Sequence, residues 1–135
     1  MKHVIDEFLR RLAVGDPDRI AELFADPADW RVSWPEPHHP AVPWIRPRSS
    51  RADVADHFRT LGNACVSGEI RVDQVLADGI DGPDAVLIGT SAQTVKLTGK
   101  RFVTSFAVHL TVGGGLITRY HVYEDSLAVA EAFAG

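Results

Sequence analysis

The second half of the chain constrains the fold most, because four runs rich in β-branched and apolar residues follow one another there. The runs cover residues 70–78, 84–96, 101–112 and 116–124, and the segments DGIDGP, LTGK and GGG between them have turn chemistry. Short connections of this kind predict an antiparallel sheet. Asp125 follows the last run and is placed to cap a short helix over 126–133.

The first half predicts helices. Apolar residues recur at helical spacing over 4–12, and Gly15 is a natural stop. Asp16-Pro17 predicts the cap and first turn of a second helix that ends near residues 26–27, and Ser50 with Asp53 predicts a third helix that closes at 62–63. Alternation over 30–34 predicts a short strand between them. We therefore expect an α+β fold, in which a curved, mainly antiparallel sheet wraps around N-terminal helices over a cone-shaped apolar pocket.

The length of 135 residues predicts a single domain over 1–135. The chain has one cysteine and no apolar run of about 20 residues, so we expect a cytoplasmic protein without a membrane partner. A net charge of −4 argues against a nucleic-acid partner. Four arginines nonetheless cluster locally, and they predict either a solvated face or an anion site at the start of the third helix: Arg46, Arg48, Arg51 and Arg59.

The GGG turn predicts the register of the last hairpin. If Val112 lies opposite Leu116, then Val108 faces Tyr120 and Phe106 faces Val122. One face of the hairpin is then apolar and lines the pocket. The other face is mixed and suits an interface, with Ser105, Ala107, His109, Ile117, Arg119, His121 and Tyr123.

Two segments resemble the nuclear transport factor 2-like superfamily, also called the SnoaL-like or ketosteroid-isomerase-like fold. FLRRLAVGDPDRIAELFADP (8–27) resembles its opening helix pair, and GGGLITRYHVYEDS (113–126) resembles its closing strand. The resemblance implies a conical pocket for a small apolar molecule, cyclic or polyketide-like. It also implies a homodimer formed through the outer sheet face, and proton-transfer chemistry of the isomerase, cyclase or dehydratase type.

The resemblance also shows which catalytic groups are missing. Phe8 stands where ketosteroid isomerases have a tyrosine, and Val108 or Ala107 stands where they have a neutral acid. No acid occurs over 32–34, where their proton-shuttling aspartate lies. Val122 replaces the last-strand acid of related cyclases and epoxide hydrolases, and Ser91-Ala92-Gln93 replaces the Arg-x-Asp of the latter. We therefore expect a pocket without the carboxylates that these enzymes use.

The segment WPEPHHPAVPWIRP (34–47) gathers proline, tryptophan and histidine. It predicts a docking ligand for a partner, a metal site or the wall of a pocket, and the resemblance places it at the pocket mouth. Adjacent histidines in an extended chain point to opposite sides, so we expect no metal, and we expect no cofactor. The candidate catalytic residues are Glu36, His38 or His39 as the base and Tyr120 as a hydrogen-bond donor.

The predicted pocket wall combines the mouth segment, the helices and the inner sheet face. Its members are Phe8, Trp30, Trp34, Trp44, His57, Phe58, Ser91, Gln93, Phe106, Val108 and Val122. His57 also fits a packed core histidine, and the spacing of His121 and Asp125 suggests a dyad. The alternative function is a non-catalytic dimeric interaction domain whose pocket is collapsed.

Overall fold

The computed structural model describes residues 1–34, 39–79 and 82–135. Its elements follow one another as α1 (Lys2–Val14), α2 (Pro17–Ala21), β1 (Phe24–Val32), α3 (Arg51–Ala64), β2 (Cys65–Ala77), β3 (Asp84–Val95), β4 (Arg101–Gly113), β5 (Leu116–Glu124) and α4 (Ser126–Phe133). The α+β class is confirmed. No helix in these ranges is long and apolar enough to cross a membrane.

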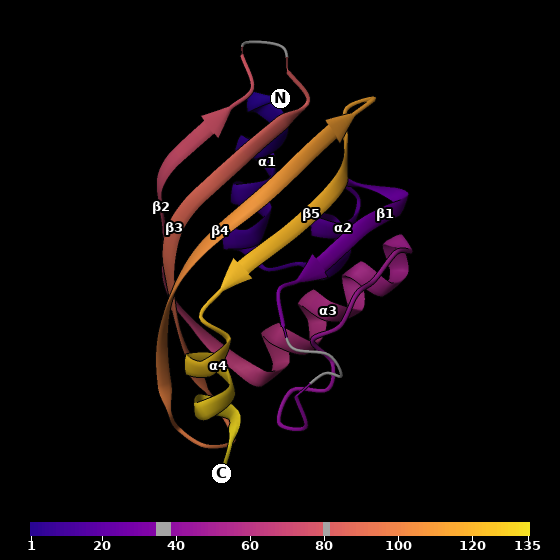
Figure 1. The fold of residues 1–135 in the computed structure, drawn as a ribbon. Coiled ribbons are helices and arrows are strands. Elements are labelled where there is room, and N and C mark those ends of the chain that lie inside the picture. The colour runs from indigo at the N-terminus through magenta and orange to yellow at the C-terminus, as the bar shows by residue number, and fades with distance from the viewer. Residues whose placement is uncertain (35–38, 80–81) are drawn as a thin grey trace.

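The strands form one curved sheet in the order β1-β5-β4-β3-β2. Every neighbouring pair is antiparallel except β1 and β5, which run parallel. Figure 1 shows α1 and α3 on one side of the sheet, and α4 at the end where β5 finishes. The mainly antiparallel sheet around N-terminal helices is therefore confirmed.

The local signals at the first two helices have the predicted physical basis. Gly15 ends α1 with a φ of 84°, and its N–H donates to the carbonyl of Arg11. The Asp16 side chain accepts from the backbone N–H of Asp18 and of Arg19, and Pro17 occupies the first turn of α2. These capping contacts depend on neighbouring residues alone, so the sequence could reveal them.

The predicted length of the second helix is wrong. Instead of ending near residues 26–27, α2 ends at Ala21 and β1 begins at Phe24. Phe24 pairs with Ile117 of β5, and the Ile117 N–H donates to the Leu23 carbonyl. Pairing with the last strand therefore overrides the helical pattern of apolar residues.

The register of the last hairpin also differs from the prediction. Phe106 pairs with Glu124 and Val108 with Val122, two residues away from the predicted partners, and the register shifts between Thr111 and Val112. Because the shift is two residues, the inner and outer faces keep their predicted members over most of the hairpin. The exception is Ile117, which was expected on the outer face and is fully buried in the core.

The core lies between α1, α3 and the inner face of the sheet. Trp30, Phe8 and Phe24 are its largest fully buried side chains. The Tyr120 ring lies 5.5 Å from the rings of both Phe8 and Phe24, in edge-to-face contact. A second apolar cluster, which includes Val42 and Phe102, packs under α4. Together the two clusters hold the helices at the distance from the sheet that leaves room for a cavity.

Candidate functional site

A cavity of about 170 Å³ lies between the helices and the inner sheet face. Its lining comes from α1, β1, α3, the segment before α3, all four antiparallel strands and α4. The lining residues are Phe8, Leu9, Leu12, Trp30, Val32, Trp44, Ile45, His57, Phe58, Leu61, Ile70, Leu87, Ser91, Gln93, Phe102, Thr104, Phe106, Val108, Tyr120, Val122, Glu124 and Val129. Most of this wall is apolar, and much of it is aromatic.

The cavity brings together most of the predicted wall. Of the residues named from the sequence, it includes Phe8, Trp30, Trp44, His57, Phe58, Ser91, Gln93, Phe106, Val108, Tyr120 and Val122. Trp34 is not a lining residue. Glu36 and His38 lie outside the described residues. His39 does not line the cavity, and its Nδ1 accepts a hydrogen bond from the Ala41 N–H at 3.0 Å.

The expectation of a pocket without carboxylates is wrong, because Glu124 belongs to the cavity wall. It is the last residue of β5 and lies on the inner face two residues beyond Val122. Burial raises the pKa of its carboxyl group, the hydrogen bond from Trp34 lowers it, and the net shift is upward. The alternation of Tyr120 and Val122 along β5 was the signal that could have found Glu124.

Trp34 lies outside the cavity wall but holds this carboxylate. Its indole Nε1 donates to Glu124 Oε1 at 3.0 Å. The two residues are 90 positions apart in the chain, so no local pattern could have paired them. A tryptophan of the predicted mouth segment therefore fixes the position of the one acid in the described wall.

Tyr120 lies at the other end of the same strand face. Burial raises the pKa of its phenol, and the negative charge of Glu124 raises it further. The hydroxyl therefore stays protonated at neutral pH and is a donor rather than a base. Since a strand rises about 3.3 Å per residue, the four residues from Tyr120 to Glu124 correspond to about 13 Å along β5.

His57 is both a packed residue and a cavity residue. Its ring centroid is 4.3 Å from that of Trp30 and 5.3 Å from that of Trp44. Burial and, to a smaller extent, the positive charges of Arg48 and Arg46 lower its pKa to about 3. Its Nδ1 is buried and has no hydrogen-bond partner among the described residues. The imidazole is therefore neutral at physiological pH.

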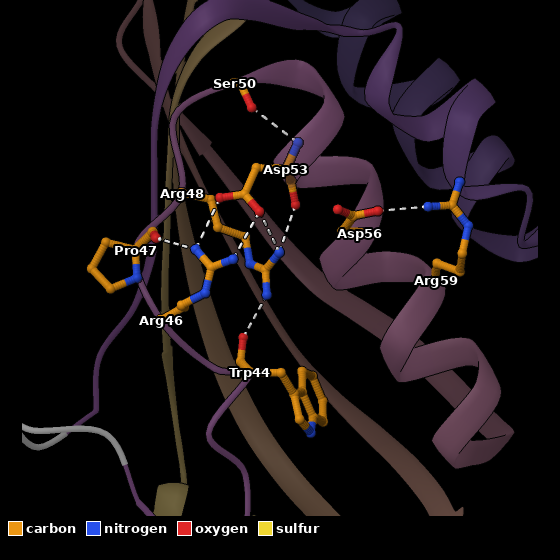
Figure 2. A network of polar contacts seen from close by, with 8 residues as sticks. All are labelled: Trp44, Arg46, Pro47, Arg48, Ser50, Asp53, Asp56 and Arg59. Carbon is orange, nitrogen blue, oxygen red and sulfur yellow. Dashed lines mark hydrogen bonds and ion pairs between the residues drawn. The ribbon is translucent and has the colours of Figure 1, made fainter.

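Behind His57, a buried arginine ties the segment before α3 to the helix (Figure 2). The side chain of Arg48 is 3% exposed. Its Nη1 donates to the Asp53 carbonyl oxygen at 2.7 Å and to Asp53 Oδ1 at 2.9 Å, and its Nη2 donates to the Trp44 carbonyl at 2.7 Å. Arg46 adds a bidentate contact to the Asp53 carboxylate, with both distances 2.9 Å. This network holds the Trp44 wall of the cavity against α3.

The structure divides the arginine cluster. Arg46 and Arg59 are exposed, as a solvated face predicts, whereas Arg48 is buried. Arg51 does not face an external anion, because its Nε and Nη2 donate to the Phe24 carbonyl at 3.0 and 2.8 Å. Arg59 pairs with Asp18 at 2.9 Å and Asp56 at 2.7 Å. The arginines connect elements of the same chain, which is a contact that sequence spacing does not reveal.

A second hollow, of about 400 Å³, adjoins the cavity between α1 and β2. It shares Leu9, Leu12 and Ile70 with the cavity wall. Ile70 is 43% exposed although it faces inward on β2, so this edge of the sheet is poorly covered. The cavity therefore adjoins an open groove on the side of α1 and β2.

The outer sheet face carries two histidine and aspartate pairs. His109 and His121 are register partners on β4 and β5. His109 Nε2 lies 2.9 Å from Asp84 Oδ1, and His121 Nε2 lies 2.9 Å from Asp29 Oδ2. The suggested dyad of His121 with Asp125 is wrong, because Asp125 caps α4 by accepting from the Ala128 N–H.

The described part of the chain has no cluster of side chains suited to bind a metal ion. No group of three or more histidine, cysteine, aspartate or glutamate side chains there is arranged to hold an ion. The polar side chains of the cavity wall are instead the Glu124 carboxylate, the hydroxyls of Ser91, Thr104 and Tyr120, the amide of Gln93 and the neutral imidazole of His57. Such a wall can enclose an apolar molecule and place one carboxylate against it.

The family model of the SnoaL-like domain matches residues 5–120. The chain belongs to the SnoaL-like domain family. No curated protein matches the chain.

Solved structures share the fold of this SnoaL-like domain at low sequence identity. An NTF2-like protein from Burkholderia thailandensis is 20% identical, with a TM-score of 0.80, and the match covers 98% of this chain and 96% of that one. A protein with a ketosteroid isomerase-like fold from Catenulispora acidiphila, in complex with trimethylamine, is 12% identical, with a TM-score of 0.77 and coverage of 96% and 90%.

The fold also occurs in an enzyme. An LEH-like epoxide hydrolase from M. tuberculosis is 16% identical to this chain, with a TM-score of 0.71 and coverage of 97% and 86%. Identities this low establish the shared fold alone.

Proposed function

We propose that this protein binds a small, largely apolar, cyclic or polyketide-like molecule in the cavity, and that Glu124 exchanges a proton with it. The reaction would then be of the isomerase, cyclase or dehydratase type. The observation that carries the proposal is the position of Glu124, a partly buried carboxylate with a raised pKa in a wall made mainly of apolar side chains.

The properties of Glu124 suit a general base. Proton transfer is most efficient when the pKa of the catalytic group lies near the working pH, and burial shifts this carboxyl group in that direction. The Trp34 indole fixes the carboxylate by a hydrogen bond at 3.0 Å. Tyr120 lines the same cavity from the same face of β5, and we assign it the role of a hydrogen-bond donor to the ligand.

The cavity volume limits the size of the ligand. A cavity of about 150 Å³ in another protein holds benzene, and this one measures about 170 Å³. A single ring with small substituents therefore suits it. Two proteins with the same fold support a small ligand and a catalytic role, since one is in complex with trimethylamine and another is an epoxide hydrolase.

The proposal is tested by proton exchange on model compounds. Small cyclic ketones and diketones are incubated with the protein in D₂O, and NMR follows deuterium incorporation next to the carbonyl. We expect exchange above the buffer rate, and a loss of about 100-fold in Glu124→Gln. Glu131→Gln is the matched control, because it makes the same charge change at an exposed position on α4.

One outcome of the exchange experiment would contradict the proposal. Exchange that is equally fast in the wild type and in Glu124→Gln would contradict a base role for this residue. If catalysis survives in Glu124→Gln, the general base would instead be Glu36 or His38, which remain predictions.

We also propose that two copies pair through the outer sheet face, and that the protein works in the cytoplasm. Tyr123 is 52% exposed and Val103 is 47% exposed on that face, so a second copy would remove apolar area from water. The sole cysteine, Cys65, is a buried free thiol, which suits a reducing compartment. Analytical ultracentrifugation tests the pairing. We expect a dimer that Tyr123→Glu dissociates, and a monomeric wild type would contradict it.

A further inference from the structure

The charges that face the cavity have one sign. Among the described lining residues, Glu124 is the single carboxylate, and none is a lysine or an arginine. The nearby guanidinium of Arg48 is already engaged by Asp53 and by the Trp44 carbonyl. His57 adds no positive charge, because it is neutral. A ligand in the cavity therefore meets an acid with no base to balance it.

The hydrogen bonding of Glu124 is incomplete as well. The indole N–H of Trp34 is the one donor that the described residues give its side chain. A carboxylate can accept several hydrogen bonds, and a buried one is normally paired with a positive charge. Among the described residues, Glu124 Oε2 has no donor and is not sealed from solvent, so it is open to water or to a group of the ligand.

The surroundings of the carboxylate are aromatic. Phe106 is the direct register partner of Glu124 across β4 and β5, which places the two side chains about 5 Å apart at Cβ. The Trp34 indole, which donates to Glu124, is a second ring beside the carboxylate. Trp44, Phe102 and Trp30 line other parts of the same cavity. Aromatic faces attract cations through the quadrupole of the ring, and the attraction increases when water is excluded.

We propose that the ligand carries a compact positive charge, a tertiary or quaternary ammonium group, which sits between the Phe106 ring and the Glu124 carboxylate. The inference rests on the proposed function and names the chemical class of its ligand. An ammonium group beside Glu124 favours the ionised carboxylate, which is the form that accepts a proton from the rest of the molecule. The same arrangement rejects small carboxylates, because they would place two negative charges in one cavity.

Two molecules of equal shape test the inference. Choline and 3,3-dimethylbutan-1-ol differ in a positively charged nitrogen in place of a carbon atom. Their binding is measured by isothermal titration calorimetry and by the fluorescence of Trp30 and Trp44, which line the cavity. We expect choline to bind about tenfold more tightly than the alcohol. This preference should disappear in Glu124→Gln and persist in Glu131→Gln.

The outcomes separate this inference from the function on which it rests. If both molecules bind with equal affinity, or the alcohol binds better, the cavity binds ligands but the ammonium inference is wrong. If neither binds, the binding function fails as well. If choline is preferred equally in the wild type and in Glu124→Gln, the carboxylate does not hold the charge and the inference is overturned. Circular dichroism of each variant shows that it is folded.

Discussion

Two charged side chains near the cavity, Arg48 and Glu124, differ in how many hydrogen bonds the protein gives them. The Arg48 guanidinium is 3% exposed, and it donates to a carboxylate and two carbonyl oxygens. The Glu124 carboxylate is partly buried, and among the described residues it receives one hydrogen bond, from Trp34. The positive charge is paired within the protein, although the Arg48 Nε has no partner among the described residues. The negative charge is held in place but left open toward the cavity.

The difference separates a structural charge from one that is available to a ligand. Burying an ion costs several kcal/mol, and partners within the protein offset this cost. Arg48 has such partners because it joins the loop to α3, which Figure 2 shows. The desolvation cost of the Glu124 carboxylate is only partly offset by the protein. A bound ligand or a proton would offset the rest.

The largest effect is expected from Asp53→Asn. This variant leaves the Arg48 charge buried without its carboxylate, and we expect the free energy of unfolding to fall by about 3 kcal/mol. Urea denaturation measures it. Asp56→Asn, an exposed carboxylate on the same helix, is the control and should cost less than about 1 kcal/mol. A negligible effect of Asp53→Asn would show that Arg48 does not need its partner.

The second effect is a pH dependence that originates at His57. Its pKa is about 3 in the folded state, and an unfolded histidine titrates near about 6.5. Below pH 6.5 the unfolded chain therefore binds a proton that the folded chain does not, so stability decreases as the pH falls. From pH 7 to pH 4 the loss from this residue is about 3 kcal/mol. Denaturation of the wild type and of His57→Phe at both pH values measures it.

His3→Phe is the matched control, because His3 is an exposed residue of α1. This variant should keep the pH dependence of the wild type, whereas His57→Phe should flatten it. An equal slope in all three proteins would contradict a neutral, buried His57.

Trp34→Phe should have a smaller effect. It removes the hydrogen bond to Glu124 but retains an aromatic ring, and a hydrogen bond to a charged group contributes about 1.5–3 kcal/mol. We expect a loss of about 1.5 kcal/mol in the wild type. In the Glu124→Gln background the same substitution should cost less, which a double-mutant cycle measures. Additive effects would show that the two side chains are not coupled.

Glu124→Gln itself should change stability least. It removes a carboxylate that the protein does not fully satisfy, so we expect a change of less than about 1 kcal/mol in either direction. Thermal denaturation at pH 7 measures it. If Glu124→Gln lowers the free energy of unfolding as much as Asp53→Asn does, Glu124 stabilises the fold in the way that Arg48 does.

The comparison also explains what the sequence could predict. Gly15, Asp16 and Asp125 act on residues within a few positions, so their helix ends were predictable from local chemistry. The faces of the last hairpin were predictable because side chains alternate along a strand. The register of this hairpin was not predictable, because nothing in the residues of the turn indicates the shift between Thr111 and Val112.

Long-range contacts account for the part of the site that was missed. Trp34 and Glu124 meet only when β1 lies beside β5. Arg48 lies five positions from Asp53, but the spacing alone does not show that the arginine is buried. Both contacts depend on how the sheet and α3 pack, and a single sequence does not specify that packing.

Glu124 is a partly buried carboxylate of the cavity wall that receives one hydrogen bond from the described residues. A pH titration of the side-chain carboxyl carbons by NMR tests it directly, with Glu124→Gln to assign the resonance. We expect Glu124 to titrate above the ordinary glutamate pKa of about 4.3, and we expect choline to lower this pKa. A Glu124 resonance that titrates together with the exposed glutamates, unaffected by choline, would contradict it.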